Sequence, residues 1–99
     1  MSENIRHAAS GTDGSFIYEK DGKQVGEMHY NVADEHKIII DHTEVDEAEE
    51  GHGIGKKLLG ELVSFVRSKQ IKVVPQCTFA HATLKRSKDW QDVLFTEPG

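Results

Sequence analysis

The sequence predicts one α+β domain: a mixed, mostly antiparallel and twisted sheet of about five strands, with a long helix after a central strand and a second helix near the carboxyl terminus. Three observations lead to this prediction. The first 45 residues alternate apolar and polar side chains, as strands do. The segment after them changes to a helical period. Finally, 99 residues are too few for two independent cores, so residues 1–99 are expected to form a single domain.

Four strands are expected in the amino-terminal half, over the approximate ranges 5–8, 15–20, 24–32 and 37–45. Turn-forming residues separate them. Asp21-Gly22 is typical of a tight hairpin, because both residue types tolerate positive φ. Phe16 and Tyr18 share one face of the second strand, opposite to Ile17.

The third and fourth strands are expected to supply much of the core. One face of the third strand consists of Gly26, Met28, Tyr30 and Val32, and we assign this face to the core. The fourth strand contains three consecutive isoleucines, Ile38–Ile40, so apolar side chains point to both of its faces. Such a strand is typical of the centre of a sheet that is covered on both sides.

Helical periodicity follows the fourth strand. An apolar stripe through Ile54, Leu58, Leu62 and Phe65 predicts a helix of about sixteen residues. The β-branched segment 71–74 is predicted to form a short fifth strand that Pro75 ends, because proline lacks the N–H that a ladder needs. A right-handed crossover would bring this strand into the sheet. The prediction is completed by a helix over 78–85, a helical turn near 90–94 and a frayed end at 96–99.

Composition excludes several classes of function. Seventeen acidic and twelve basic residues give a net charge of −5, which disfavours binding to nucleic acid. The longest aliphatic run, Ile38–Ile40, is far shorter than a membrane span, and no secretory segment follows Met1. Cys77 is the only cysteine, which excludes an internal disulfide and favours a reducing compartment. We therefore expect a cytoplasmic monomer or weak homodimer without a nucleic-acid or membrane partner.

A glycine-rich loop, Glu50-Gly51-His52-Gly53-Ile54-Gly55-Lys56, lies between the fourth strand and the long helix. Glycines let a backbone approach an anion closely, and the unpaired N–H groups of a helix's first turn attract phosphate. The spacing differs from that of a P-loop and from that of the dinucleotide-binding fingerprint. The loop therefore indicates a pyrophosphate site of another kind. The alternative is that the glycines only form a tight turn between strand and helix and bind no ligand.

The run from Val45 to Leu59, which contains this loop, resembles the acetyl-CoA-binding motif of the GNAT superfamily of N-acetyltransferases. The order of the predicted elements is similar to that family too, in particular to a short single-domain subgroup. The resemblance implies a transferase that uses acetyl-CoA. It also implies that Glu44 and its neighbours lie beside the thioester arm, and that the loop amides of residues 52–56 hold the pyrophosphate. The cofactor-binding residues that it implies are Thr43, Val45, Gly51, His52, Gly53, Ile54, Gly55 and Lys56.

The chain departs from the family pattern at three places. Glu50 stands where Arg or Gln is usual, and it follows other acidic residues just before the site of a polyanion. Thr83 and Leu84 stand where many members have a tyrosine that protonates the leaving thiolate. The helices that usually follow the first strand have no room between Ala8 and Phe16, so an open acceptor site is expected.

Cys77 is a candidate catalytic residue, because it lies at the predicted start of the second helix, where the helix dipole favours thiolate. It could accept the acetyl group or protonate the departing CoA. A cysteine that packs as a small hydrophobe is the alternative.

His42 and Glu44 are the other catalytic candidates. They share one face of the fourth strand, and either could deprotonate an incoming ammonium group. The alternative is structural: Glu44 pairs with a basic neighbour, and His42 forms a hydrogen bond in the core. His29 is expected near them across the sheet. No metal is predicted, because Cys77 and His81 are the only pair at ligand spacing and a structural zinc site needs four ligands.

Three functions are compatible with the sequence. The first is an N-acetyltransferase for an unidentified amine of a small molecule or a protein. The second is a CoA-binding module without turnover, which acts as a sensor or partner-binding domain. The third is a small interaction domain without a ligand.

Overall fold

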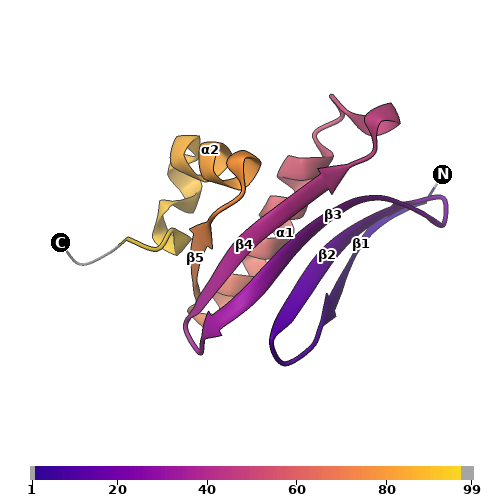
Figure 1. Ribbon diagram of the computed structural model, residues 1–99. Coiled ribbons are helices and arrows are strands. Elements are labelled where there is room, and N and C mark those ends of the chain that lie inside the picture. The colour runs from indigo at the N-terminus through magenta and orange to yellow at the C-terminus, as the bar shows by residue number, and fades with distance from the viewer. Residues whose placement is uncertain (1, 97–99) are drawn as a thin grey trace.

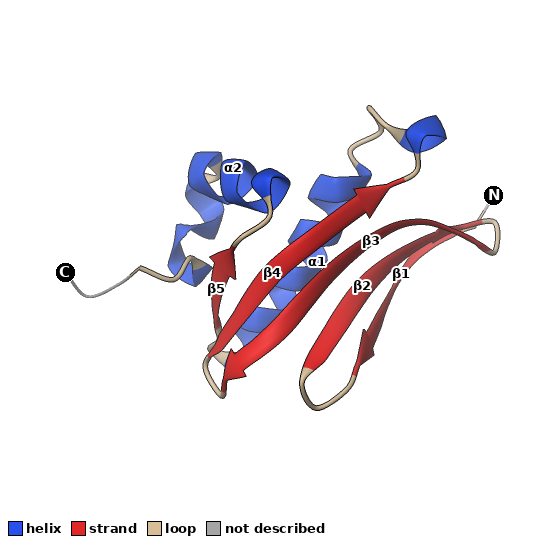
Figure 2. Ribbon diagram, viewed as in Figure 1, coloured by secondary structure: helices blue, strands red, loops and turns tan. Residues whose placement is uncertain are grey.

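One five-stranded sheet organises the molecule, with the strands in chain order from one edge to the other. The computed structural model describes residues 2–96 (Figures 1 and 2). The first four strands are antiparallel, and the fifth is parallel to the fourth, as the predicted crossover requires. The strands are β1 (Glu3–Ala9), β2 (Asp13–Lys20), β3 (Lys23–Asp34), β4 (Lys37–Val45) and β5 (Lys72–Pro75).

Two helices follow the long strands. They are α1 (Ile54–Lys69) and α2 (Thr78–Arg86), and the chain also contains two short 3₁₀ helices, η1 (Glu47–Glu49) and η2 (Lys88–Val93). The predicted strand and helix types are all confirmed, with bounds that move by a few residues. The predicted fraying of 96–99 lies, apart from Thr96, outside the described residues. None of the helices in the described part is long and apolar enough to cross a bilayer.

The β2–β3 hairpin turns at the predicted residues. Asp21 has φ 52° and Gly22 has φ 81°, the left-handed conformation that this tight turn requires at both positions.

The core lies between α1 and one face of the sheet (Figure 1). The predicted apolar stripe of α1 faces inward: Leu58, Leu62 and Val66 are completely buried, as are Met28 and Ile40 on the sheet. Burial of this stripe stabilises α1, because an isolated helix of this length is only marginally stable in water. Phe65, at the border of the core, packs into an aromatic group with His7, Phe16 and Tyr30.

No helix of the described residues lies over the other face of the sheet, which corrects the prediction that β4 is covered on both sides (Figure 1). Ile38 and Ile40 are buried under α1, whereas Ile39 is half-buried on the bare face. β4 is an interior strand between β3 and β5, and β3 is the middle one. The physical reason is the short β1–β2 connection, residues 10–12, which leaves no chain to cover that face.

Candidate functional site

β4 and β5 separate halfway along β4. They pair only from Lys37–Lys72 to Ile40–Pro75, and the Ile40 carbonyl then accepts the N–H groups of Gln76 at 2.9 Å and Cys77 at 3.1 Å. Within residues 2–96, no backbone hydrogen bond joins β4 beyond Ile40 to β5 or α2. The second half of β4 therefore has one edge on β3 and one edge free to bind a ligand backbone.

Cys77 lies where the two strands separate, and it is the N-cap of α2. Its sulfur accepts the N–H of Ala80 at 3.3 Å and lies 3.3 Å from the Thr43 hydroxyl oxygen of β4. The predicted position at a helix start is thus confirmed. The side chain is half-buried, so it contacts the core and also reaches the free edge.

The glycine loop ends in an uncapped helix start. Gly53, the N-cap of α1, has φ 74°, and Gly51 has φ 87°, so both lie in the left-handed region that favours glycine. Apart from the glycine itself and its two chain neighbours, no described residue has an atom within 4 Å of where a Cβ would project at either position. The amides of residues 53–56 form no hydrogen bond with another described residue, which leaves them available to an anion.

Two other predicted loop residues, Gly55 and His52, have different environments. Gly55 is needed for packing, because a Cβ there would lie 2.8 Å from the ring of Phe79. The His52 amide is already bonded to the Glu49 carbonyl at 3.3 Å, and its imidazole lies 3.5 Å from the Glu49 carboxylate. His52 is therefore tied within the loop, unlike the four residues after it.

A groove of about 340 Å³ joins the free edge of β4 to the start of α1, and we call it the loop groove. The predicted cofactor-binding residues line it, with the exception of His52. Phe79 closes it on the side of α2. Its lining residues are Thr43, Val45, Glu49, Glu50, Gly51, Gly53, Ile54, Gly55, Lys56 and Phe79.

The charge of the acidic loop is partly neutralised by lysines from the β2–β3 hairpin. Lys20 donates to Glu49 at 3.0 Å, and this hydrogen bond lowers the pKa of the Glu49 carboxyl. Lys23 lies 3.6 Å from Asp46. Glu50, in contrast, forms no ion pair with another described residue. It is thus the acidic residue of the loop groove whose charge most directly opposes an anion.

A second groove, of about 590 Å³, lies on the bare face of the sheet, and we call it the acidic groove. Thr43, Val45 and Glu50 line both grooves, so the two meet at the free edge of β4. Five carboxylates line the acidic groove: Glu27, Glu44, Asp46, Glu47 and Glu50.

The structure does not bring the three catalytic candidates together. Glu44 lies on the bare face with His42, 3.4 Å from its imidazole, while the alternating side chain of Thr43 points the other way and meets Cys77. The His42 side chain is 53% exposed, which rules out the alternative position in the core. The predicted nearness of His29 is confirmed, since it pairs directly with His42 across β3 and β4.

Glu27 is a candidate for binding a cationic acceptor that the sequence analysis did not single out. It lies directly opposite Glu44 in the β3–β4 ladder, and its carboxylate accepts the hydroxyl of the buried Ser15 at 2.6 Å. Like charges opposite each other destabilise a sheet, so this pair favours a cation between the two carboxylates. Strand alternation in the sequence could have indicated this role, because it places Glu27 on the face of β3 away from the core.

His29 holds the irregular part of β4. Its ring nitrogens lie 2.7 Å from Asp41 and 2.8 Å from Asp13, and the register of β4 shifts next to this point. The hydrogen bonds to Asp13 and Asp41 raise the pKa of His29, so the imidazolium is favoured. His29 therefore links the first residue of β2 to β4 at the place where the free edge begins.

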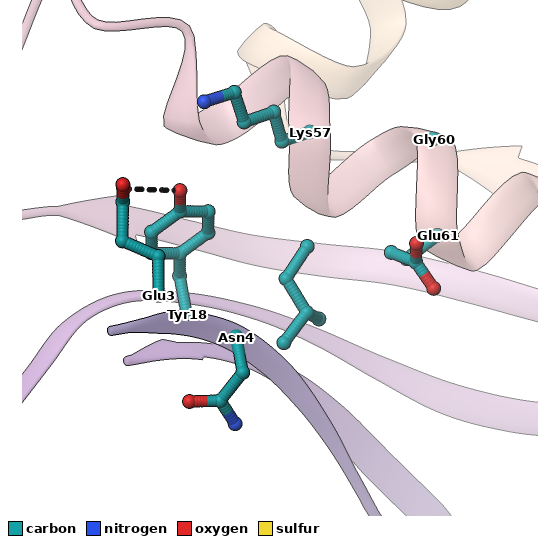
Figure 3. A pocket seen from close by; sticks show the side chains of 7 residues that line it. Glu3, Asn4, Tyr18, Lys57, Gly60 and Glu61 are labelled. Atoms are coloured by element: carbon teal, nitrogen blue, oxygen red, sulfur yellow. Dashed lines mark hydrogen bonds between the residues drawn. The ribbon is translucent and has the colours of Figure 1, made fainter. Parts of the chain in front are cut away.

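A third cavity, of about 440 Å³, lies away from these grooves, between β1, β2 and α1 (Figure 3). Tyr18 donates to Glu3 at 2.6 Å there, and the Lys57 ammonium lies 5.8 Å from the centre of the Tyr18 ring. No predicted site residue lines this cavity. In residues 2–96 no three His, Cys, Asp or Glu side chains are placed to hold a metal ion.

Comparison with known proteins finds similarity to one family over most of the chain. The family model of the GCN5-related N-acetyl-transferases matches residues 15–93. A GCN5-like protein of Staphylococcus aureus, solved by NMR, is 29% identical and superposes with a TM-score of 0.73, covering 96% of this chain and 92% of that one. No curated protein sequence matches significantly.

More distant structures share the fold. A GNAT family acetyltransferase from Elizabethkingia anophelis, solved with acetyl-CoA bound, is 14% identical with a TM-score of 0.68 over 85% of this chain and 72% of that one. An aminoglycoside acetyltransferase from an uncultured soil metagenomic sample, solved with sisomicin, is 21% identical with a TM-score of 0.64 over 91% and 64%.

Proposed function

Because the chain belongs to the family of GCN5-related N-acetyltransferases, we propose that it transfers an acetyl group from acetyl-CoA to an amine. The observation that carries the proposal is the loop groove, in which the free edge of β4 meets four unpaired amides at the start of α1. When bound, acetyl-CoA supplies an acetyl group activated as a thioester.

The loop groove has the donors that the polar parts of acetyl-CoA require. The amides of residues 53–56 and the Lys56 ammonium bind the pyrophosphate, and the helix dipole of α1 adds to their attraction. The backbone from Thr43 to Val45 would pair with the amides of the pantetheine arm, because no described strand pairs with this edge of β4. Gly51 and Gly53 leave open the space that side chains would take.

Cys77 donates the proton that the departing thiolate needs. Leu84 is completely buried and Thr83 is nearly so, so neither replaces the missing tyrosine. The Cys77 thiol lies next to the free edge, and Thr43, 3.3 Å away, orients its sulfur. Transfer of the acetyl group to Cys77 itself is the other role that this position permits.

The amine reaches the free edge from the acidic groove. The carboxylates there attract an ammonium ion, and the groove meets the loop groove at Thr43 and Val45. Glu44, or His42 beside it, accepts the proton that makes the amine nucleophilic. In this arrangement the bare face of the sheet is the open acceptor site.

A two-stage experiment tests the proposal. Uniformly ¹⁵N-labelled protein is titrated with CoA, and we expect the amide signals of residues 43–45 and 51–56 to shift while those of the β3–β4 turn do not. Acetyl transfer from acetyl-CoA to a panel of primary amines and lysine peptides is then measured. Absence of shifts at millimolar CoA would contradict the proposal that the loop groove binds CoA. Shifts without acetyl transfer to any amine would favour a CoA-binding module without turnover.

A further inference from the structure

Residues 46–53 join β4 to α1 and contain the first part of the glycine loop, and we call them the connecting segment. At its start, the Asp46 amide donates to the Val25 carbonyl of β3 at 2.8 Å. From Glu47 to His52, the described backbone hydrogen bonds join residues of the segment only to one another. The backbone of the segment is thus fixed at its two ends but not along its length.

Burial holds the connecting segment at one residue only. All of its residues are exposed except Glu49, whose side chain is 15% exposed. The first fully buried residue after the segment is Ile54, which already belongs to α1. An ionised carboxylate is costly to remove from water, so its burial in an otherwise exposed segment requires a specific partner.

The partner of Glu49 is Lys20. Lys20 Nζ lies 3.0 Å from Glu49 Oε1, and the lysine side chain is 28% exposed. Among the described ion pairs of a lysine or arginine with a carboxylate, this one is the most buried. The His52 imidazole lies 3.5 Å from the same carboxylate oxygen. Glu49 therefore connects the middle of the glycine loop to the sheet.

Lys20 provides a rigid anchor for this contact. It is the last residue of β2, and its backbone lies between two strands, opposite Glu3 of β1 and Lys23 of β3. Lys20 does not line the loop groove, whereas Glu49 does. Its contact with the groove is therefore indirect, through Glu49.

We propose that Lys20 is a positioning residue for the glycine loop: it holds Glu49 against the end of β2 and so fixes the connecting segment before the ligand binds. The inference rests on the proposed function, since it assumes that the loop groove binds CoA. Two physical effects follow from the contact. A segment that is already fixed loses less conformational entropy on binding, and a neutralised Glu49 repels the pyrophosphate less.

Lys20→Met tests the inference, because methionine keeps most of the apolar stem and removes the ammonium group. We expect the affinity for CoA, measured by calorimetry, to fall about fivefold, which is the loss expected for a partly buried ion pair. The KM for acetyl-CoA should rise by a similar factor while kcat stays unchanged, because the substitution does not touch the reacting atoms. Lys20→Arg keeps a donor for the same carboxylate and should retain most of the affinity.

Backbone ¹⁵N relaxation of the protein without CoA measures the positioning directly. In Lys20→Met the order parameters of residues 47–53 should fall, while those of residues 58–66 in the buried part of α1 should not change. Order parameters of residues 47–53 that equal those of the wild type would overturn the inference.

A double-mutant cycle tests whether Lys20 acts through Glu49. Lys20→Met should have little further effect on CoA affinity in a protein that already carries Glu49→Gln. Fully additive effects would mean that the ammonium group acts on the anion independently of Glu49, which overturns the inference.

Lys23→Met is the matched control. Lys23 lies in the same hairpin and pairs with Asp46 at 3.6 Å, but its side chain is 76% exposed. This variant should keep the CoA affinity within about twofold of the wild type. Unchanged affinity in Lys20→Met, or equal losses in Lys20→Met and Lys23→Met, overturns the inference and leaves the proposed function intact. Absence of CoA binding by the wild-type protein overturns the proposed function, and this inference with it.

Discussion

The Thr43 hydroxyl and the Cys77 sulfur are 3.3 Å apart, although 34 positions separate them in the chain. This contact joins the free edge of β4 to the first turn of α2, at the point where β4 and β5 separate. Two polar side chains thus lie where the proposed function requires a proton donor.

Cys77→Ala should abolish most acetyl transfer while leaving CoA affinity unchanged, because the thiol acts on the leaving group and the loop holds the nucleotide. It should also lower the free energy of unfolding by about 1 kcal/mol, since α2 loses its N-cap acceptor. Cys77→Ser keeps the cap and should restore that stability. Transfer rates, calorimetric CoA affinity and thermal unfolding of the three proteins separate these effects. Full activity in Cys77→Ala would assign proton transfer to His42 or Glu44.

Bound CoA should protect Cys77 from alkylation. Iodoacetamide labelling of the wild-type protein, followed by mass spectrometry with and without saturating CoA, measures the protection. A labelling rate that CoA does not change would place the cysteine outside the site.

Gly53→Asn should weaken CoA binding, and it should cost no more stability than the same substitution at a control glycine of similar φ. Gly53 has φ 74°, a conformation that asparagine adopts readily, and the new side chain would project into the open space beside the loop amides. Gly22→Asn is the matched control, because Gly22 has φ 81° in the distant β2–β3 turn. Gly53→Val should lose stability as well, since a β-branched residue is strained at positive φ. Normal CoA affinity in Gly53→Asn would move the pyrophosphate away from this loop.

Glu50→Gln should tighten CoA binding about two- to fivefold at low ionic strength, because it removes an unpaired negative charge from the loop groove. The gain should shrink in high salt. Glu47→Gln is the control, since Glu47 lines the acidic groove only. Calorimetric titration with CoA at two salt concentrations measures the affinity of both variants. Weaker binding in Glu50→Gln would mean that this carboxylate braces the loop.

His29→Gln should remove a pH-dependent part of the stability. The partners Asp13 and Asp41 raise the pKa of His29 in the folded protein. Its contribution is therefore complete below the ordinary histidine pKa of about 6.5 and is lost as the pH rises through the folded value. The difference in melting temperature between wild type and variant should be larger at pH 6 than at pH 9.

Two other groups titrate with the opposite sign. Burial lowers the pKa of His7, so this residue destabilises the fold as the pH falls below about 6.5. The pKa of Asp13 is lowered by Ser10 and His29, and its contribution is lost in acid. Because His7 is the same in both proteins, the difference between wild type and variant isolates the His29 network. A difference that does not change with pH would contradict the prediction.

Local patterns in the sequence were sufficient to predict the elements and the position of the loop. The apolar stripe of α1, the Asp21-Gly22 turn and the glycines before Ile54 are each encoded within a few consecutive residues. Backbone conformation and periodicity are local properties, so these predictions needed no knowledge of distant partners. The same holds for the start of α2 at Cys77.

Only the tertiary structure decided which residues share a groove. Strand alternation places Thr43 and Glu44 on opposite faces of β4. Which of the two meets Cys77 depends on which face α1 covers and on where β4 and β5 separate. The pairing of Lys20 with Glu49, the opposition of Glu27 and Glu44, and the contact of Thr43 with Cys77 join segments far apart in the chain. Sequence periodicity carries no record of such contacts, because they arise from the register of the strands and the packing of two helices on one face.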